Sequence, residues 1–142
     1  MGDEVTSAAL HEGIISSITT RNLDTVRLFA DHFILASGGF FSKGLVSTPT
    51  QVYDPLIGLD MDYSEDRNAW YNEEFFESQP YMNFGVKTDA DLHPFKDGEP
   101  VRNLYAIGSI LGNTRKEDFG TAAGLAIRTA FAAVDAIKGG NV

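Results

Sequence analysis

The chain has 142 residues, enough for one domain with a buried core. Its net charge of −9 excludes nucleic acid as a general partner, because binding a phosphate backbone requires a basic surface. The sequence contains no cysteine, which excludes disulfides, thiolate nucleophiles and cysteine-ligated metal clusters within this chain.

The sequence gives no sign of membrane insertion or secretion. No stretch approaches 18 consecutive apolar residues, and the opening MGDEVTSAAL lacks the basic and apolar regions of a signal peptide. The acidity does not exclude a single phosphate group held by backbone amides.

Residues 4–36 predict a series of short strands, because β-branched residues alternate there with turn formers. The first three strands, ending near residue 30, predict a three-stranded antiparallel meander with a turn at Glu12–Gly13. The apolar run FILA (33–36) predicts a strand buried on both faces, as in a parallel sheet. This strand stops at Ser37, Gly38 and Gly39.

The middle of the chain carries most of the aromatic residues and predicts a second small core. Residues 64–76 predict a short helix with Ser64 as its N-cap. That helix would place four aromatic side chains on one apolar face: Trp70, Tyr71, Phe75 and Phe76.

The last part repeats the pattern of a buried strand that ends at glycine. The run LYAI (104–107) predicts a strand that stops at Gly108, and residues 120–138 predict a helix ended by Gly139–Gly140. Helical spacing predicts that the buried stripe of this helix consists of Ile127, Ala130, Phe131, Val134 and Ile137.

The first turn of this helix carries very little side chain: Gly120, Thr121, Ala122 and Ala123. A helix start presents unpaired N–H groups and a partial positive charge, worth about 0.3–1 kcal/mol to an anion and up to ~2 kcal/mol when partly buried. A flat ligand whose edge gains negative charge, such as a reduced flavin, fits this feature. Tight helix–sheet packing fits it equally well. Two glycine-ended strands favour the cofactor, because ligands bind at the carboxyl ends of such strands.

Three further residues are candidates for contact with a substrate. His93, in the segment DLHP, is a candidate substrate ligand or base, whereas no other histidine has a supporting pattern. Arg115 and Lys116 precede the helix and are candidates to meet a phosphate, although they also fit a solvated loop balanced by neighbouring acids. No metal-ligand spacing is present, so we expect no metal site.

Three separated segments carry a family resemblance: ADHFILASGGFFSKGL, NFGVKTDADLHP and VRNLYAIGSILG…GTAAGLAIRTA. Together they resemble, in the same order, the C-terminal part of FAD-dependent oxidoreductases of the fumarate reductase/glycerol-3-phosphate dehydrogenase type. The segments DPLIGLD and FGVKTD point to the glycerol-3-phosphate branch. The resemblance implies an α/β fold: a partial FAD-binding Rossmann-like domain with an antiparallel β-meander and a C-terminal helix.

The resemblance also implies a division of the chain and a set of cofactor-binding residues. Residues 1–47 and 101–142 would belong to the flavin-binding domain, and 48–100 partly to a substrate or capping region. Ser37, Gly38 and Gly39 would lie near the dinucleotide part of the flavin, and Gly108 and Ser109 near its pyrophosphate or ribityl chain. Gly120, Thr121, Ala122 and Ala123 would lie at the pyrimidine edge of the ring.

The implied activity is oxidation of sn-glycerol 3-phosphate to dihydroxyacetone phosphate, with FAD or FMN as cofactor and electrons passed to quinone. The implied partners are a companion flavoprotein subunit and an iron–sulfur subunit that attaches the complex to the inner face of the cell membrane, which makes the location cytoplasmic and peripheral. Two alternatives stay open: a non-catalytic electron-relay or assembly subunit of that complex, and a related flavoenzyme with another substrate such as fumarate.

One departure from the family pattern concerns the pyrophosphate-binding turn. Such proteins begin with a strand and a G-x-G-x-x-G turn, and this chain has neither. We therefore expect a C-terminal fragment that is inactive in isolation and binds flavin weakly or not at all. We also expect open strand edges and self-association.

Overall fold

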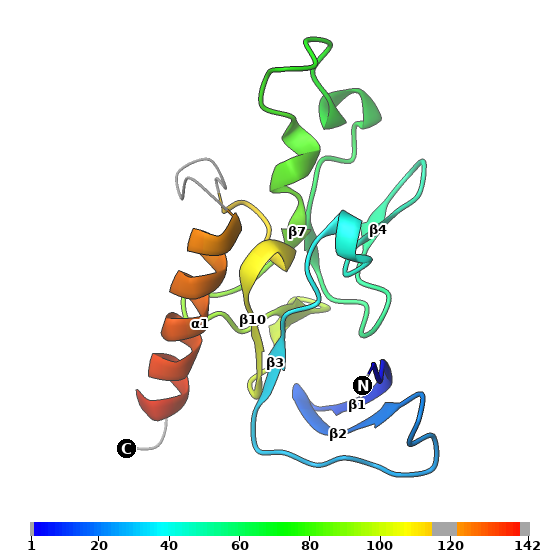
Figure 1. The fold of residues 1–142 in the computed structure, drawn as a ribbon, viewed down its shortest axis with the longest axis vertical. Coiled ribbons are helices and arrows are strands. Elements are labelled where there is room, and N and C mark those ends of the chain that lie inside the picture. The colour runs from blue at the N-terminus through cyan, green and yellow to red at the C-terminus, as the bar shows by residue number, and fades with distance from the viewer. Residues whose placement is uncertain (1, 115–121, 140–142) are drawn as a thin grey trace.

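The computed structural model describes residues 2–114 and 122–139 (Figure 1). Its strands are β1 (Val5–His11), β2 (Ile14–Thr20), β3 (Phe33–Leu35), β4 (Val46–Ser47), β5 (Val52–Tyr53), β6 (Met61–Asp62), β7 (Gly85–Val86), β8 (Phe95–Lys96), β9 (Glu99–Pro100) and β10 (Leu104–Ala106). Its 3₁₀ turns are η1 (Phe40–Ser42), η2 (Arg67–Trp70), η3 (Pro80–Asn83) and η4 (Gly108–Ile110), and its α-helix is α1 (Ala122–Gly139).

Strands β1 and β2 form an antiparallel hairpin, as predicted. Its turn residues Glu12 and Gly13 both have positive φ, 49° and 74°, which matches the right-handed twist of the two strands. The predicted third strand of the meander is reduced to one bridge, in which Ile18 and Leu28 exchange backbone hydrogen bonds of 3.0 and 2.9 Å. The segment around Leu28 is exposed, so little burial supports a longer pairing.

Both predicted glycine-ended strands are present, and they form a parallel pair, β3 and β10, with Phe33, Ile34 and Leu35 opposite Leu104, Tyr105 and Ala106. The pairing continues past β10, where the Ile107 N–H donates to the Leu35 carbonyl at 3.0 Å. All of β10 is buried. Ile34 on β3 is exposed, so the prediction that both faces of this strand are buried is wrong for the described residues.

One apolar core joins all three predicted segments of the chain. Its buried members are Ile15, Leu35, Leu45, Leu59, Val86, Val101, Leu104, Ala106, Ile110 and Leu111. Asn103 ties the hairpin to it, because its side-chain amide exchanges two 2.8 Å hydrogen bonds with the backbone of Ile15. A second small core of Val52, Trp70 and Phe84 confirms the prediction for the aromatic middle region. The division into segments at residues 47 and 100 stays a prediction.

Helix α1 packs through one leucine and two smaller residues. Its buried positions are Leu125, Thr129 and Ala133, and the Thr129 hydroxyl accepts the Gly108 N–H at 2.9 Å while donating to the Leu125 carbonyl at 2.8 Å. Close approach of the helix to η4 favours these short side chains.

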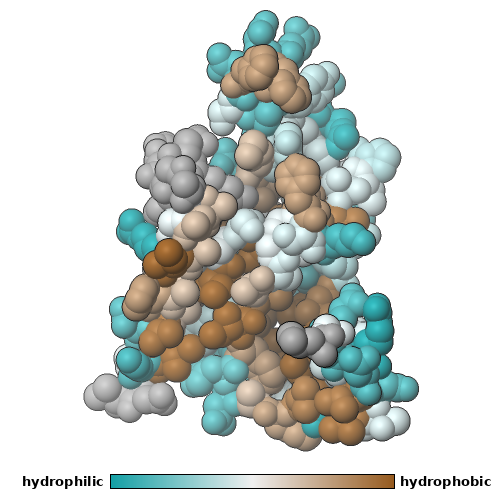
Figure 2. Space-filling view, viewed as in Figure 1, coloured by the Kyte–Doolittle hydropathy of each residue, from teal (hydrophilic) through white to brown (hydrophobic). Residues whose placement is uncertain are grey.

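The predicted buried stripe on α1 is wrong for its large members Ile127, Phe131 and Val134, whereas Ala130 and Ile137 are half-buried. Ile127 and Phe131 are 60% and 69% exposed, and Figure 2 shows apolar surface over the helix. Helical spacing identified an apolar face, but it could not tell which face meets η4, because the buried face carries one large apolar residue, Leu125, beside Thr129 and Ala133.

The predicted helix over residues 64–76 is also wrong, since only η2 is helical there and Asp66, not Ser64, caps it. Amide side chains give the following loop other hydrogen-bond partners. Asn72 donates to the Ser78 carbonyl at 2.7 Å, and Gln79 donates to the Glu74 and Glu77 carbonyls at 3.1 and 3.2 Å.

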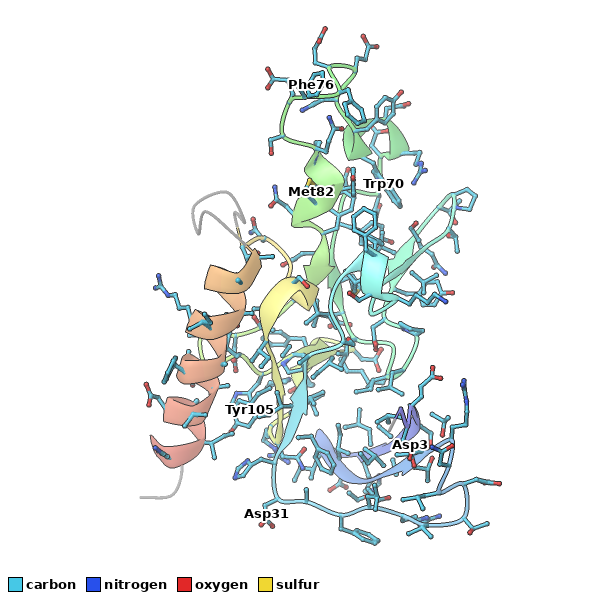
Figure 3. The ribbon with its side chains drawn as sticks, viewed as in Figure 1. Asp3, Asp31, Trp70, Phe76, Met82 and Tyr105 are labelled. Carbon is cyan, nitrogen blue, oxygen red and sulfur yellow. The ribbon has the colours of Figure 1, made fainter. Side chains whose placement is uncertain are left out.

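Phe75 and Phe76 therefore do not share a buried face with Trp70. They lie at the tip of the loop, 83% and 99% exposed, with Phe76 farthest from the body of the molecule in Figure 3.

Replacing Thr129 by valine tests the contact that docks α1. The change keeps the shape of the side chain but leaves the buried Gly108 N–H without its acceptor, so we expect a loss of about 1–3 kcal/mol in unfolding free energy. Chemical denaturation followed by circular dichroism measures it. Thr25→Val, at an exposed position, is the control, and an equal effect of both substitutions would contradict the assigned role.

Candidate flavin-binding site

The loop that follows β3 is shaped by glycines. Gly38 has a φ of +80°, a conformation that L side chains rarely adopt. The chain then turns through η1, and the Gly44 N–H donates to the Gly39 carbonyl at 3.1 Å. A Cβ on Gly44 would collide with the Gly38 carbonyl oxygen, so the loop closes this tightly only with glycine there.

The two glycine-ended strands meet at one edge of the parallel pair. A Cβ built on Gly39 would lie 3.3 Å from the Ser109 carbonyl oxygen, and one built on Gly38 would lie 3.7 Å from the Ser109 hydroxyl. Gly39, Ser109 and Ala122 together line one cavity of about 250 Å³. This cavity, the Gly39 pocket, brings together a residue from each of the three features identified in the sequence: both strand ends and the helix start.

Sequence reasoning missed most of the wall of the Gly39 pocket. The remaining lining residues are Phe40, Phe41, Ser42, Tyr81 and Met82. Phe40 and Tyr81 meet edge to face with ring centroids 6.2 Å apart, although they are far apart in sequence. The sequence signal that could have identified part of this wall is the pair Phe40–Phe41 directly after two glycines. In the structure Phe41 is exposed beside the loop.

Other predicted cofactor residues lie near the Gly39 pocket without lining it. Ser37 lines a neighbouring cavity of about 500 Å³ together with Lys43 and Asp54. Gly108 is buried, and its N–H is engaged by Thr129, so its contact with α1 matches the packing alternative considered for the small residues. Ala123 lies on an exposed part of α1. Gly120 and Thr121 lie outside the described residues, as do the substrate candidates Arg115 and Lys116.

His93 belongs to a different cluster. Its Nδ1 lies 3.2 Å from an Asp89 carboxylate oxygen, and its ring centroid lies 4.7 Å from that of Tyr105. His32 also belongs to this cluster, with its ring centroid 5.8 Å from that of Tyr105. Figure 3 places Tyr105 in the lower half of the molecule and Met82, which lines the Gly39 pocket, in the upper half. The structure therefore does not bring His93 to the Gly39 pocket.

Within residues 2–114 and 122–139, no three histidine, aspartate or glutamate side chains are grouped so that they could hold a metal ion. In the same residues, α1 is the one α-helix, and it is not apolar enough along its length to cross a membrane.

The FAD binding domain family matches residues 2–123, and the chain belongs to this family. This membership and the parallel pair, the antiparallel strand pairs and the C-terminal helix confirm the predicted partial α/β FAD-binding fold.

Among curated proteins, the chain is similar to one component of anaerobic glycerol-3-phosphate dehydrogenase, the subunit designated B, from several bacteria. It is 41% identical to that of Vibrio vulnificus (strain CMCP6) over 97% of this chain and 32% of the relative. For Yersinia pseudotuberculosis (strain IP32953) the identity is 40%, over 91% of this chain and 30% of the relative. The chain thus spans about a third of the length of these relatives. No solved structure matches it.

The residues of the Gly39 pocket fit part of a flavin ring. Gly39 and Ala122 leave backbone accessible, and Phe40 and Tyr81 offer flat side chains. None of the described residues that line the pocket is charged, so a neutral tricyclic ring meets no unpaired charge on these walls.

Tyr105 provides a pH test of the His93 cluster. Burial first, and then the charges of Asp91 and Asp89, raise the pKa of Tyr105 above its ordinary value of 10.0. The folded state thus holds the phenol proton more tightly than the unfolded state, and this contribution is complete below pH 10 and is lost as pH rises through the folded pKa. We expect the unfolding free energy of the wild type to fall more steeply than that of Tyr105→Phe above pH 10.

Denaturant titrations between pH 8 and 11 measure this difference. Tyr53→Phe, on β5, is the control and should follow the wild-type slope. Parallel curves for the wild type and Tyr105→Phe would show that burial of the Tyr105 phenol does not affect its ionisation.

Proposed function

We propose that the Gly39 pocket receives the isoalloxazine part of a bound flavin. The observation that carries the proposal is the convergence of Gly39, Ser109 and Ala122 on one uncharged pocket, in a chain that belongs to the FAD binding domain family. The family favours FAD over FMN. Bound there, the flavin supplies a two-electron acceptor.

The proposed cofactor site also includes residues that do not line this pocket, from the loop after β3, the end of β10 and the region of the helix start. Ser37 and Gly38 would serve the dinucleotide part from the loop after β3. Gly108 and Ser109, at the end of β10, would lie near the ribityl or pyrophosphate region. Gly120, Thr121, Ala122 and Ala123, which the sequence predicts as a helix start, would face the pyrimidine edge, where unpaired N–H groups of a helix start would stabilise negative charge.

The proposed activity of the whole protein is oxidation of sn-glycerol 3-phosphate to dihydroxyacetone phosphate within an anaerobic dehydrogenase complex, with electrons delivered to quinone. Its support is the name of the relatives, which are subunits of such an enzyme. That name implies partner subunits, which we propose to be a flavoprotein and an iron–sulfur protein at the inner face of the cell membrane.

A non-catalytic relay or assembly role is the second candidate, because the only base suggested by the sequence, His93, does not line the Gly39 pocket. A full-length subunit that carries this sequence, loaded with flavin, distinguishes the two. Anaerobic addition of glycerol 3-phosphate to the subunit alone should bleach the flavin absorbance if oxidation occurs here. Bleaching only after addition of the partner subunits would favour the relay. Reoxidation of the reduced flavin by fumarate, which takes up its two electrons and two protons to become succinate, without bleaching by glycerol 3-phosphate, would instead favour the related flavoenzyme.

Self-association of the isolated chain is proposed on two exposed features. The face of α1 that carries Ile127 and Phe131 is unburied, and Ile34 is exposed on β3. Apolar surface and open edges of this kind favour association between copies.

Filling the Gly39 pocket tests the flavin assignment. In the full-length subunit, Ala122→Phe should occupy the space beside Gly39 and Ser109 and lower the FAD content at least about tenfold. Ala132→Phe is the matched control, because Ala132 lies on the same helix at an exposed position that lines a different cavity. Absorbance near 450 nm after gel filtration gives the flavin content. Full FAD content in Ala122→Phe, with unchanged circular dichroism, would contradict the assignment of the flavin to this pocket.

A further inference from the structure

A second cavity adjoins the Gly39 pocket. It has a volume of about 300 Å³ and shares three wall residues with its neighbour: Phe40, Phe41 and Tyr81. Its other walls are Ser47, Trp70 and Tyr71, and Arg67 completes the lining. We call it the Arg67 pocket.

The charge of the Arg67 pocket is opposite to that of the chain. The protein has a net charge of −9, with 20 acidic residues against 11 lysines and arginines. Among the described residues that line the pocket, Arg67 is nevertheless the only charged one, and none is an aspartate or glutamate. The other polar groups are the hydroxyls of Ser47, Tyr71 and Tyr81, which can donate hydrogen bonds to an oxygen anion.

Arg67 is positioned by a rigid platform. Its guanidinium carbon lies 4.2 Å from the centroid of the Trp70 ring. Trp70 is 5% exposed, and its indole N–H donates to the Ser64 carbonyl at 2.7 Å. Its ring also meets Phe84 edge to face at 5.4 Å. Stacking on a fixed ring orients the guanidinium and leaves its N–H edge available.

No carboxylate of the described residues lies within ion-pair distance of this guanidinium. Arg21 forms an ion pair with Glu4, whereas no carboxylate in residues 2–114 and 122–139 forms one with Arg67. The nearest acid along the chain, Asp66, uses its carboxylate to accept the Asn68 N–H at 3.0 Å at the start of η2.

We propose that the Arg67 pocket binds the phosphate group of a small organic phosphate, with Arg67 as its principal ligand. A planar guanidinium forms two parallel hydrogen bonds to a phosphate, and the hydroxyls around it extend that contact. The shared wall of Phe40, Phe41 and Tyr81 places the remainder of the ligand beside the Gly39 pocket. The identification of the substrate as sn-glycerol 3-phosphate rests on the proposed function, whereas the phosphate site rests on the pocket alone.

The chain contains its own reporter for this site. Trp70 is its single tryptophan, and its ring stacks against the Arg67 guanidinium. Because a ligand bound to the guanidinium changes the environment of this ring, we expect binding to change the tryptophan emission. Residues 1–142 are titrated with sn-glycerol 3-phosphate, inorganic phosphate, glycerol and fumarate, and the emission is followed. We expect saturable changes with the two phosphates, no change with glycerol, and weakening of the response as NaCl is raised.

Substitutions at Arg67 assign the response. Arg67→Gln should raise the dissociation constant for glycerol 3-phosphate at least about tenfold, and Arg67→Lys should fall between it and the wild type because a single ammonium cannot form the paired contact. Arg27→Gln removes an exposed arginine from the loop between β2 and β3 and should bind as the wild type does. Circular dichroism establishes that each variant is folded.

Three outcomes would overturn the proposal. They are the absence of a saturable response to either phosphate in the folded wild type, wild-type affinity in Arg67→Gln, and tighter binding of fumarate than of both phosphates, which would make the pocket a carboxylate site. The titration needs neither flavin nor turnover. A failed flavin-loading or bleaching experiment therefore leaves it intact, and a failed titration leaves the flavin assignment intact.

Discussion

The parallel pairing of β3 with β10 is the constraint on which the rest of the structure depends. These strands are separated by residues 36–103, nearly half of the chain, and each contributes only three residues to the ladder. Because they run in the same direction, their carboxyl ends meet at one edge, and the loops that follow them face each other. The Gly39 pocket exists because both loops turn at glycine there, and α1 can reach the same edge because it docks on Gly108 through Thr129.

The strand ends were predictable because they depend on local chemistry. A short apolar run that stops at Ser37-Gly38-Gly39 or at Gly108 marks a buried strand followed by a tight turn, and no tertiary information is needed to see it. The hairpin turn at Glu12–Gly13 is local in the same sense. The two glycine-ended strands were predicted separately, whereas the structure shows that they pair with each other and that their ends meet at one edge.

The orientation of α1 and the course of residues 64–79 were not predictable in this way. Apolar periodicity identifies the face of a helix that prefers burial, but here α1 meets the glycine turn η4 through Thr129 and buries Leu125 and Ala133 in place of Ile127 and Phe131. In the aromatic segment, Asn72 and Gln79 compete with the helix by bonding to backbone carbonyls, and Trp70 is drawn into a core with Phe84 from a later segment. Both outcomes depend on partners distant in sequence, as does the contribution of Tyr81 and Met82 to the pocket wall.

The loop that carries Phe75 and Phe76 has an entropic consequence. Its backbone is held by side-chain amides at both of its stems, so the chain has already lost its freedom on folding, while two aromatic rings remain in water. A surface that covers these rings would gain their burial without the cost of ordering the loop that presents them. A loop that is disordered before binding differs, because the conformational entropy lost on ordering it offsets much of the free energy gained by burying its side chains.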